Sequence, residues 1–481
     1  MSHEHTVVYL ARLVLELRTP LSIGTGNPDG VFDTSLVRDA NGLPAIPGSS
    51  LAGVLRHLWL ASHAEDSADD LFGFQDRAEG GASRVSVSWG VVLDSRGEPV
   101  EGLLMGDQAQ RLDDALLSRV LQQIDAPVYR NRVRLTHRGA AAPTGKFDRT
   151  VLPAGHRFAL ELRLWAREDD DGTQWRNLLD LFGHPGFRLG GATRAGLGSV
   201  RPVSIYQRRF DLRTPTEAVA FRVLGRGLTD STGLDTHEPR CANDDWITGT
   251  LRLKANGLWR IGQGSQPLAP GAGKPADLLP VTEERIAWSD NTGKPVPHAL
   301  LFPASSLKGA LAHRMAFHAH RLAGTWAEDV GQVDDPERPP AVRRLLGDVK
   351  RSADAGADTS SSAAGSAGCL YLDDAFLPVD QVQIERLMHN AIDRFTGGVR
   401  NRMLFEEESI YGGEVAIPVA IDRRRLGNGP EADETRRAFS AAIRDLCEGR
   451  LGLGSRSTTG NGFFSGEVTG YLREWVNPET A

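Results

Sequence analysis

Alternating and helical hydrophobic patterns recur along this chain of 481 residues. The alternating stretches LVLEL at 13–17 and LRLKA at 251–255 predict strands, because successive side chains of a strand point to opposite faces. Apolar residues at helical spacing follow each strand and predict two amphipathic helices, with Leu51, Leu55 and Leu58 in one and Leu307, Leu311 and Met315 in the other. Serine side chains are expected to cap these helices: Ser49 or Ser50, and Ser305 or Ser306.

Five sequence features occur twice in the same order, which indicates a duplicated domain. The pairs are LSIGTG and LWRIGQG, RDANGLP and SDNTGKP, PGSSLAGVL and PASSLKGAL, LFG and LLG, and two glycine-rich segments, RLGGATRAGLGSV at 188–200 and RLGLGSRSTTGNGFF at 450–464. A second helix precedes each glycine-rich segment, with Leu178, Leu181 and Phe182 in the first copy and Phe439, Ile443 and Leu446 in the second.

This element order predicts an α+β fold of two ferredoxin-like (RRM-like) domains with antiparallel sheets. The first copy is predicted to span 1–210 and the second 246–481, with a polar linker at 211–245. Long insertions are expected in the second copy near 264–300 and 324–368, and the low-complexity part at 352–368 is expected to be disordered.

Composition limits the possible classes of protein. The chain is 40% hydrophobic and 24% charged, with no apolar run of membrane-spanning length, which is typical of a soluble globular protein. Its start does not match a signal peptide, and three isolated cysteines favour the reducing cytoplasm and argue against a zinc site. A net charge of −7 does not favour nucleic-acid binding over the whole surface, although a local basic groove remains compatible with it.

The two glycine-rich segments are candidate anion sites. Glycine permits close approach of backbone N–H groups to a phosphate, and each segment also contains an arginine, Arg194 or Arg456. Neither segment contains GK[ST], so neither is a Walker A loop. The alternative is a glycine-rich turn that leads into the last strand. The glycines concerned are Gly190, Gly191, Gly196 and Gly198 in the first copy, and Gly452, Gly454, Gly460 and Gly462 in the second.

The basic segment at 128–149 predicts a second nucleic-acid contact. Arg130, Arg132 and Arg134 alternate along a predicted strand, so their side chains share one face that suits a row of phosphates. Tyr129 and Phe147 offer surfaces on which bases could stack. The alternative is the solvated face of an edge strand. The segment 393–408, DRFTGGVRNRMLFEEE, is the counterpart in the second copy.

Carboxylates and histidines are the candidate residues for two alternative mechanisms of RNA cleavage. Asp33 and Asp39 precede the first helix, and Glu284 and Asp290 occupy the matching positions before the second. A loop carboxylate over bound RNA could hold a metal ion or orient the attacking 2′-hydroxyl, whereas the alternative is an ordinary surface loop. A histidine base could instead run metal-free cleavage. Histidines near these elements are His57, His137, His313, His318 and His320.

The ordered set IGTG, RDANGLPAIPGSSLAGVLR, DRFTGGVRNRMLFEEE and the terminal glycine loops resembles the repeat-associated mysterious protein (RAMP) superfamily. The nearest match within it is the backbone subunit of type III CRISPR effector complexes, here as two fused copies. The resemblance implies domains that stack along a guide RNA, a loop aspartate that cuts the paired target RNA with a divalent metal ion, and a protruding hairpin, the thumb, that wedges between bases.

Carried over by position, the resemblance makes Asp33 the cleaving and metal-binding residue, with Glu284 and Asp39 as weaker candidates. It implies Mg²⁺ or Mn²⁺ as cofactor, and guide RNA, single-stranded target RNA and other effector subunits as partners. A scaffold without chemistry and a histidine-dependent guide-processing endoribonuclease are the alternative functions. The expected RNA contacts, including those from the residue patterns, are Ser49, Ser50, Arg56, Arg130, Arg132, Arg134, Gly190, Gly191, Arg194, Gly196, Gly198, Ser305, Ser306, Lys308, Arg394, Gly452, Gly454, Arg456 and Gly460.

Overall fold

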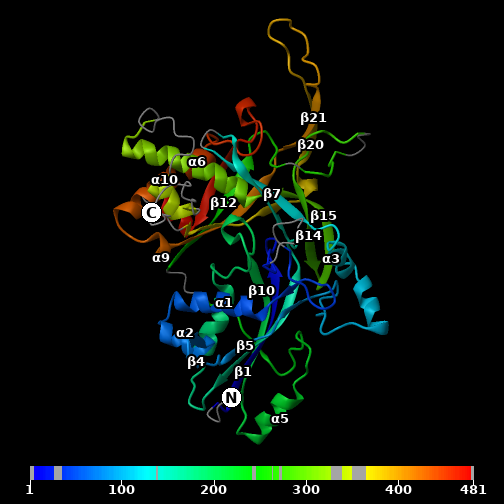
Figure 1. Cartoon of the computed structure of the whole chain (residues 1–481), viewed down its shortest axis with the longest axis vertical. Coiled ribbons are helices and arrows are strands. Elements are labelled where there is room, and N and C mark those ends of the chain that lie inside the picture. Colours follow the sequence, from blue (N-terminus) through cyan, green and yellow to red (C-terminus); the bar gives the residue numbers. More distant parts are fainter. Residues whose placement is uncertain are drawn as a thin grey trace.

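The structure is a computed structural model that describes residues 5–26, 35–136, 139–240, 245–262, 264–269, 274–326, 338–348 and 365–477. Figure 1 shows two α+β domains, one above the other, with a long hairpin projecting from the upper domain. Every pair of named strands is antiparallel within the described chain. Among the described residues, none of the helices combines the length and the apolar composition needed to cross a membrane.

The first domain is a ferredoxin-like sheet with α1, α2 and α4 packed on one face, whereas α5 contacts β10 from the other face. Its central strands run in the order β10–β1–β9–β6. The bounds are β1 (Val7–Leu17), β2 (Ala45–Ile46), α1 (Gly48–Leu60), α2 (Glu65–Phe72), β3 (Phe74–Asp76), β4 (Glu79–Gly81), β5 (Val85–Val87), β6 (Gly90–Val92), α3 (Leu117–Gln122), β7 (Tyr129–Leu135), β8 (Ala141–Thr150), β9 (Arg157–Ala166), α4 (Thr173–Asp180), β10 (Val200–Asp211), α5 (Pro215–Val223) and β11 (Asp235–Thr236).

The second domain repeats this plan in the order β23–β12–β22–β18, so each of its four central strands has a counterpart in the first. The bounds are β12 (Trp246–Ala255), β13 (Leu258–Trp259), β14 (Thr282–Ser289), β15 (Thr292–Phe302), α6 (Ala304–Ala323), α8 (Pro340–Leu346), β16 (Gly347–Asp348), β17 (Ser366–Ala367), β18 (Leu370–Leu372), β19 (Ala375–Leu377), β20 (Gln383–His389), β21 (Phe405–Tyr411), β22 (Glu414–Asp422), α9 (Arg423–Leu426), α10 (Pro430–Cys447), β23 (Phe464–Gly470) and α11 (Tyr471–Val476).

Each domain has its own large hydrophobic core. The first core draws on residues between Val7 and Ile205, and the second on residues between Ile247 and Val476. The apolar residues predicted for the helices are buried in these cores: Leu51, Leu55, Leu58, Leu178, Leu181 and Phe182 in one, and Leu307, Leu311, Met315, Phe439, Ile443 and Leu446 in the other. Helical periodicity therefore identified the inner face of each helix correctly.

Over residues 211–240, the expected linker is a structured part of the first domain. Arg12 of β1 donates to the backbone carbonyls of Gly225 and Asp230, so this segment lies over the outer face of the sheet. β11 then pairs with β10 at the edge of the same sheet. The low-complexity part at 352–364 lies outside the described residues, whereas β17 pairs with β16.

The predicted serine caps are wrong. α1 begins at Gly48 and α6 at Ala304, with Pro47 and Pro303 at the N-cap positions and no cap from their side chains. Ser49, Ser50, Ser305 and Ser306 lie inside the first turn. Proline pre-sets the backbone angle for the helix start, and a Cβ at Gly48 would lie 2.4 Å from the Val87 carbonyl oxygen. The chain therefore starts each helix through Pro-Gly or Pro-Ala rather than through serine.

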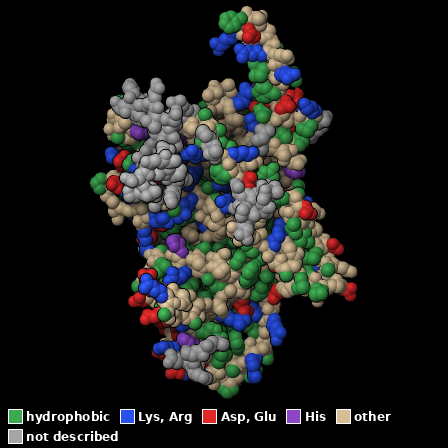
Figure 2. All heavy atoms as spheres, in the orientation of Figure 1, with side chains coloured by type: hydrophobic (Ala, Val, Ile, Leu, Met, Phe, Trp, Pro, Cys, Tyr) green, Lys and Arg blue, Asp and Glu red, His purple; other side chains and the backbone are tan. Residues whose placement is uncertain are grey.

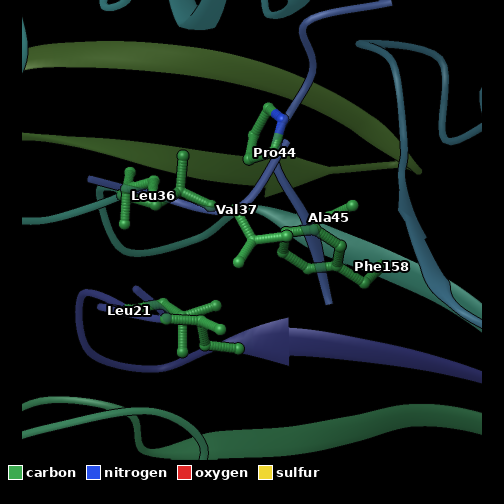
Figure 3. Close-up of a pocket in the computed structure, with 8 residues that line it drawn as sticks. Leu21, Leu36, Val37, Pro44, Ala45 and Phe158 are labelled. Atoms are coloured by element: carbon green, nitrogen blue, oxygen red, sulfur yellow. The ribbon is translucent and has the colours of Figure 1, made fainter. Parts of the chain in front are cut away.

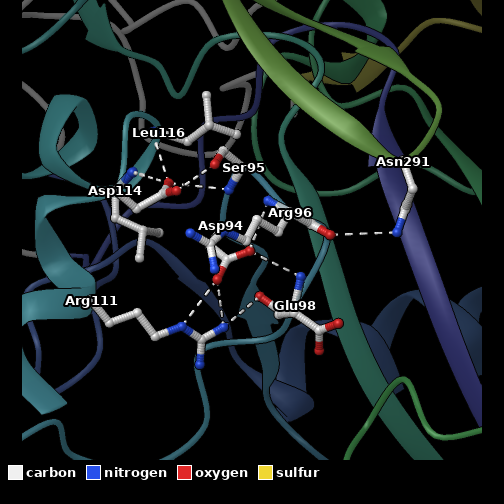
Figure 4. A network of polar contacts seen from close by, with 9 residues as sticks. Asp94, Ser95, Arg96, Glu98, Arg111, Asp114, Leu116 and Asn291 are labelled. Carbon is white, nitrogen blue, oxygen red and sulfur yellow. Dashed lines mark hydrogen bonds and ion pairs between the residues drawn. The ribbon is translucent and has the colours of Figure 1, made fainter.

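The β14–β15 hairpin of the second copy is clamped onto the first. Trp288 Nε1 donates to the Gly155 carbonyl at 2.7 Å, and Gly293 N donates to the Ser95 carbonyl at 2.8 Å. Figure 4 shows Asn291, at the hairpin tip, reaching the Arg96 carbonyl of a turn that Asp94 holds together. The two copies therefore meet through specific contacts and not merely through a connecting segment.

Candidate nucleic-acid interface

The two glycine-rich loops have the same backbone conformation. Gly190 and Gly454 both have positive φ, 75° and 82°, and Gly198 and Gly462 have 72° and 77°. The hydrogen bonds repeat as well: Gly191 N donates to the Ser22 carbonyl at 2.8 Å and Ser455 N to the Arg260 carbonyl at 2.9 Å. The two copies therefore match in backbone dihedral angles and hydrogen bonds as well as in sequence.

Most of these glycines serve chain packing, which corrects the simple idea of free phosphate cradles. A Cβ at Gly190 or Gly454 would lie 2.3 Å from a carbonyl oxygen, and at Gly198 or Gly462 it would lie 2.0 or 2.1 Å from one. Gly191 lies against Arg149, and Gly452 lies against Ser457. At Gly460, with φ of 93°, a Cβ would meet no described atom within 4 Å, so the tip of the second loop is open. For Gly190, Gly198, Gly454 and Gly462, the alternative reading of the sequence is therefore the better one: they form a glycine-rich turn.

The first glycine loop also packs against the second domain. Arg188 forms a buried ion pair with Asp373, whose other carboxylate oxygen accepts from Ser199 Oγ at 2.9 Å. A Cβ at Gly196 would lie 2.1 Å from Asp374 Oδ1, so glycine is needed where the loop approaches this carboxylate. Gly196 thus supports the contact between the copies.

Arg130 has a structural role rather than the predicted role as an RNA contact. Its guanidinium donates to both carboxylate oxygens of Glu283, at 2.7 and 2.9 Å, and to Asp374. Its side chain is only 10% exposed. Burial by itself lowers the pKa of Arg130, but the charges of Asp374 and Glu283 outweigh burial and raise it. This arginine from the first copy is therefore neutralised by two carboxylates of the second.

Asp374 also occupies the start of α6, beside the expected RNA contacts Ser305 and Ser306. The backbone N–H of Ala304 donates to Asp374 Oδ1 at 2.8 Å. The carboxylate therefore satisfies one helix N-terminal donor and places a negative charge at this helix end, which disfavours an RNA phosphate there. The predicted RNA contacts at Ser305 and Ser306 lose their physical basis as phosphate-binding groups of this helix end.

Four cations gather at the junction of the copies, and we call Arg132, Arg194, Lys308 and Arg338 the cation cluster. Arg194 lies in the first glycine loop, where its Nε donates to the Gly368 carbonyl at 2.6 Å and its guanidinium stacks over Tyr371 at 4.8 Å. Lys308 Nζ, from α6, donates to the Arg194 carbonyl at 3.1 Å. The cluster is therefore built from both copies of the domain.

Among the described residues, the cation cluster has more positive charge than its immediate partners balance. Burial and the neighbouring Arg130 lower the pKa of Arg132 to about 10, and its buried Nε has no hydrogen-bond partner in the described chain. Burial, followed by Arg194, Arg338 and Arg132, lowers the pKa of Lys308 to about 8. Mutual repulsion between buried cations is relieved by an anion, so the geometry suits a phosphate. Figure 2 shows lysine and arginine side chains gathered near the boundary between the two domains.

The remaining predicted arginines have varied surroundings. Arg134 is exposed near the end of β7. Arg56 of α1 pairs with Asp69 and is about one-third exposed. Arg456 of the second glycine loop lies 3.8 Å from the fully buried Glu407. Arg394 is exposed near the tip of the projecting hairpin. Of this group, the structure brings none into the cation cluster.

The β20–β21 hairpin matches the segment compared with a thumb. It projects beyond the rest of the second domain in Figure 1. Asp393 shapes its tip by accepting from the backbone N–H groups of Phe395 and Thr396, each at 3.0 Å. Phe395 is 99% exposed, and further apolar side chains are exposed along the hairpin: Met388, Ile392, Val399, Met403 and Leu404. Exposed apolar groups on a projecting hairpin favour contact with a partner.

The candidate cleaving residue Asp33 lies outside the described residues. The described ends of its segment are close together, because Thr25 N donates to the Ser35 carbonyl at 3.0 Å and Gly24 pairs with Leu36. Figure 3 shows a small apolar cavity beneath these ends, lined by Leu21, Ile23, Leu36, Val37, Pro44, Ala45, Leu152 and Phe158. The described residues on either side of this segment therefore pack over an apolar part of the first domain.

The other two carboxylates do not suit a metal site. Asp39 Oδ1 accepts from the backbone N–H groups of Asn41 and Leu43, at 2.8 and 2.9 Å, so this carboxylate holds a turn. Glu284 lies in β14 and pairs with Arg119 of the first copy. In the described parts of the chain, no three histidine, cysteine, aspartate or glutamate side chains are grouped as a metal ion requires. The described carboxylates therefore do not fit the expected divalent cation, and Asp33 is the remaining candidate.

The histidines lack a common site. His57 and His313 are exposed on separate helices, and His137 lies outside the described residues. His318 is buried and its Nε2 contacts Asp445 at 2.7 Å, while His320 is half-buried further along α6. His318 is therefore a buried histidine that pairs with Asp445 between α6 and α10, while its Nδ1 has no hydrogen-bond partner among the described residues, and its interior location does not favour contact with RNA.

Sequence reasoning missed four residues of the junction. Asp373, Asp374 and Glu283 neutralise arginines of the first copy, and Arg338 completes the cation cluster. The aspartate pair at 373–374 directly follows the apolar stretch CLYL, which predicts a strand and places a charged pair at its end. The position of these aspartates at a strand end could have marked them as candidates. It could not show that their partners are arginines more than 150 residues away in the chain.

Comparison with known proteins supports the duplicated fold. A model of the RAMP superfamily matches residues 14–201 and 252–465, one region in each domain and together most of the chain. No curated protein matches the chain. The two regions coincide with the two sheets and their cores, as expected if each is a complete family domain. The chain therefore belongs to the RAMP superfamily as two fused copies of the family domain, and this membership indicates a CRISPR-associated RNA-binding subunit.

Proposed function

We propose that this chain is a guide-RNA-binding backbone subunit of a type III CRISPR effector complex. The observation that carries the proposal is the cation cluster between the copies, where the half-buried Lys308 and Arg132 are held as mutually repelling cations. A nucleic-acid backbone supplies the missing negative charges without regard to base sequence. A guide of variable sequence requires this kind of binding.

Packing of the two copies supports a role in a stacked assembly. The β7–β8 hairpin of the first copy contacts the second through Arg130, whereas the corresponding β20–β21 hairpin projects from the chain. The apolar tip of the projecting hairpin offers surfaces that bases of an RNA duplex or a neighbouring subunit could cover. Phe395 is the most exposed of these side chains. Guide RNA, single-stranded target RNA and other effector subunits are the partners that this arrangement accommodates.

We also propose that the subunit cleaves target RNA through Asp33. A divalent cation, Mg²⁺ or Mn²⁺, would stabilise the charge that develops on the scissile phosphate. The support is the resemblance of the segment around Asp33 to the family motif. Asp39 and Glu284, the weaker candidates, have turn and ion-pair partners of their own. A scaffold without chemistry is the outcome if the unaltered complex binds its target and does not cut it.

RNA binding should be strongly salt-dependent and should weaken when Arg194 is replaced by alanine. Each phosphate contact with a single strand contributes about −0.7 to the slope of log affinity against log salt, so the variant should lose roughly that amount. Purified protein would be titrated with a fluorescent single-stranded RNA of mixed sequence over a range of salt concentrations. Co-expression with a repeat–spacer transcript should also yield protein that carries a short RNA.

Arg213→Ala is the matched control, because Arg213 is about half exposed and pairs with Glu168 and Asp211 of the first domain, away from the cluster. Its affinity and salt slope should equal those of the unaltered protein. The proposed function would be refuted by two results together: protein purified after co-expression whose ultraviolet absorbance is that of protein without RNA, and no measurable RNA binding at low salt. If Arg194→Ala and Arg213→Ala lose equal amounts of RNA affinity, the cation cluster is not part of the RNA-binding site.

A further inference from the structure

Lys308 has an unusual environment for a lysine. It lies in the second turn of α6, and its Nζ donates to the Arg194 carbonyl at 3.1 Å, which is a neutral acceptor. The charged or titratable groups that influence it most come from four elements: Arg194 of the glycine loop, Arg338 before α8, Arg132 of β7, and the thiol of Cys369 before β18. Three of these four are cations, so a protonated Lys308 is repelled from several directions.

The two copies hold this arrangement in place. Arg194 is fixed by its hydrogen bond to the Gly368 carbonyl and by stacking over Tyr371, both in the second copy. Arg132 Nη2 donates to the Ala195 carbonyl at 3.3 Å, within the same glycine loop that Lys308 contacts. The cations therefore cannot easily separate to reduce their repulsion. An incoming anion, or loss of a proton from Lys308, is the means by which the repulsion is relieved.

We propose that Lys308 is a proton-linked phosphate contact: when an RNA phosphate binds between the two copies, Lys308 takes up a proton from solvent and pairs with it. The inference rests on the proposed function, because it assumes that RNA is the anion that enters the cluster. It adds a specific consequence, namely that affinity for RNA depends on pH through one named side chain.

The direction of this dependence follows from proton linkage. In the free protein the pKa of Lys308 is about 8, because of burial and then of Arg194, Arg338 and Arg132, so above pH 8 the amine is mostly neutral. A bound phosphate raises this pKa, so the complex holds a proton that the free protein has released. The proton forms a bond to Nζ and comes from water or buffer, and no other bond changes. Affinity is therefore nearly constant below the free pKa and falls above it, by up to about tenfold per pH unit.

The test measures affinity for a single-stranded RNA of adenine and cytosine, whose bases do not ionise in this range, between about pH 7 and pH 9 at fixed ionic strength, below the range in which Arg132 titrates. The unaltered protein should lose affinity steadily above pH 8. Lys308→Arg keeps the positive charge but does not titrate, so its affinity should be the same at both ends of the range. Calorimetry in buffers of different ionisation enthalpy should detect proton uptake by the unaltered protein near pH 8.5, and none by the variant.

Lys254→Arg is the control, because Lys254 is exposed on β12 and should leave the pH profile unchanged. Lys308→Gln is the second variant if arginine does not fit; it should bind more weakly at pH 7 and should also lose the pH dependence. A flat profile for the unaltered protein that binds RNA would overturn this inference and leave the proposed function intact. A pH dependence that persists in both Lys308 variants would also overturn it. Failure to bind RNA at any pH would instead remove the proposed function.

Discussion

Target RNA bound to an assembled complex should remain uncut when Asp33 is replaced by alanine. A carboxylate that recruits a divalent cation beside the phosphodiester stabilises charge mainly in the transition state, so its loss should abolish cutting and leave target binding nearly unchanged. Removing such a transition-state interaction commonly costs a hundredfold to a thousandfold in rate, on the order of 2.7–4 kcal/mol. Labelled target complementary to the guide would be incubated with complexes that contain either protein, and chelator should reproduce the effect in the unaltered protein.

Two conservative variants serve as controls for that experiment. Asp39→Asn keeps the Oδ1 acceptor that binds the N–H groups of Asn41 and Leu43, so the turn and the cutting should both persist. Glu284→Gln weakens the pair with Arg119 but should not change the number of cuts. Cutting by Asp33→Ala at every position of the unaltered complex, or cutting that persists in chelator, would refute the assignment and favour a histidine mechanism.

The duplicated fold could be predicted because its signals are local and occur twice. The apolar residues of each helix repeat every three or four positions, and the glycines of both loops are needed for packing at the same places, Gly190 with Gly454 and Gly198 with Gly462. A feature that is ambiguous in one copy becomes informative when the other copy repeats it in order. The family match to both regions confirms this part of the analysis.

Predictions for the helix starts failed for a local reason. Ser49 and Ser305 follow Pro-Gly and Pro-Ala, and serine before an apolar helix is a common capping signal. In the structure the helix begins one residue before these serines, at Gly48 and Ala304. Proline at the cap position starts the helix early, and in the second copy the distant Asp374 binds the free N–H group. Only the three-dimensional arrangement brings that carboxylate to the helix.

The candidate site could be predicted only in part, because strand periodicity does not reveal what lies opposite a face. The alternation of Arg130 and Arg132 correctly placed them on one side of β7. It could not show that this side faces Glu283 and Asp374 of the other copy, which convert Arg130 from an RNA contact into a structural cation. Arg132, two residues away, remains in the cation cluster. Similarly, Glu284 matched Asp33 by sequence counting, but it lies in a strand that is clamped onto the first domain.

Replacing Asp374 with alanine should markedly destabilise the protein. Asp374 is fully buried and contacts two groups at once, the guanidinium of Arg130 and the N–H of Ala304. Removing one partner of a buried ion pair leaves the other charge undercompensated, at a cost of about 3–5 kcal/mol, and Glu283 should limit the loss to the lower end of that range. For domains of this size, a loss of about 3 kcal/mol corresponds to a melting temperature lowered by roughly 6–12 °C.

Asp374→Asn separates the two contributions of this residue. Asparagine keeps an oxygen that can accept from Ala304 N but removes the charge beside Arg130. The Asp374→Asn variant should therefore be more stable than Asp374→Ala by the contribution of a helix cap, about 1 kcal/mol, and should melt at a higher temperature. Glu414→Ala is the matched control, since Glu414 lies 3.8 Å from Arg252 with both side chains about half exposed, and such a pair contributes about 0–1 kcal/mol. Melting of all three variants would be followed by tryptophan fluorescence. If Asp374→Ala melts no lower than Glu414→Ala, the buried carboxylate does not join the copies.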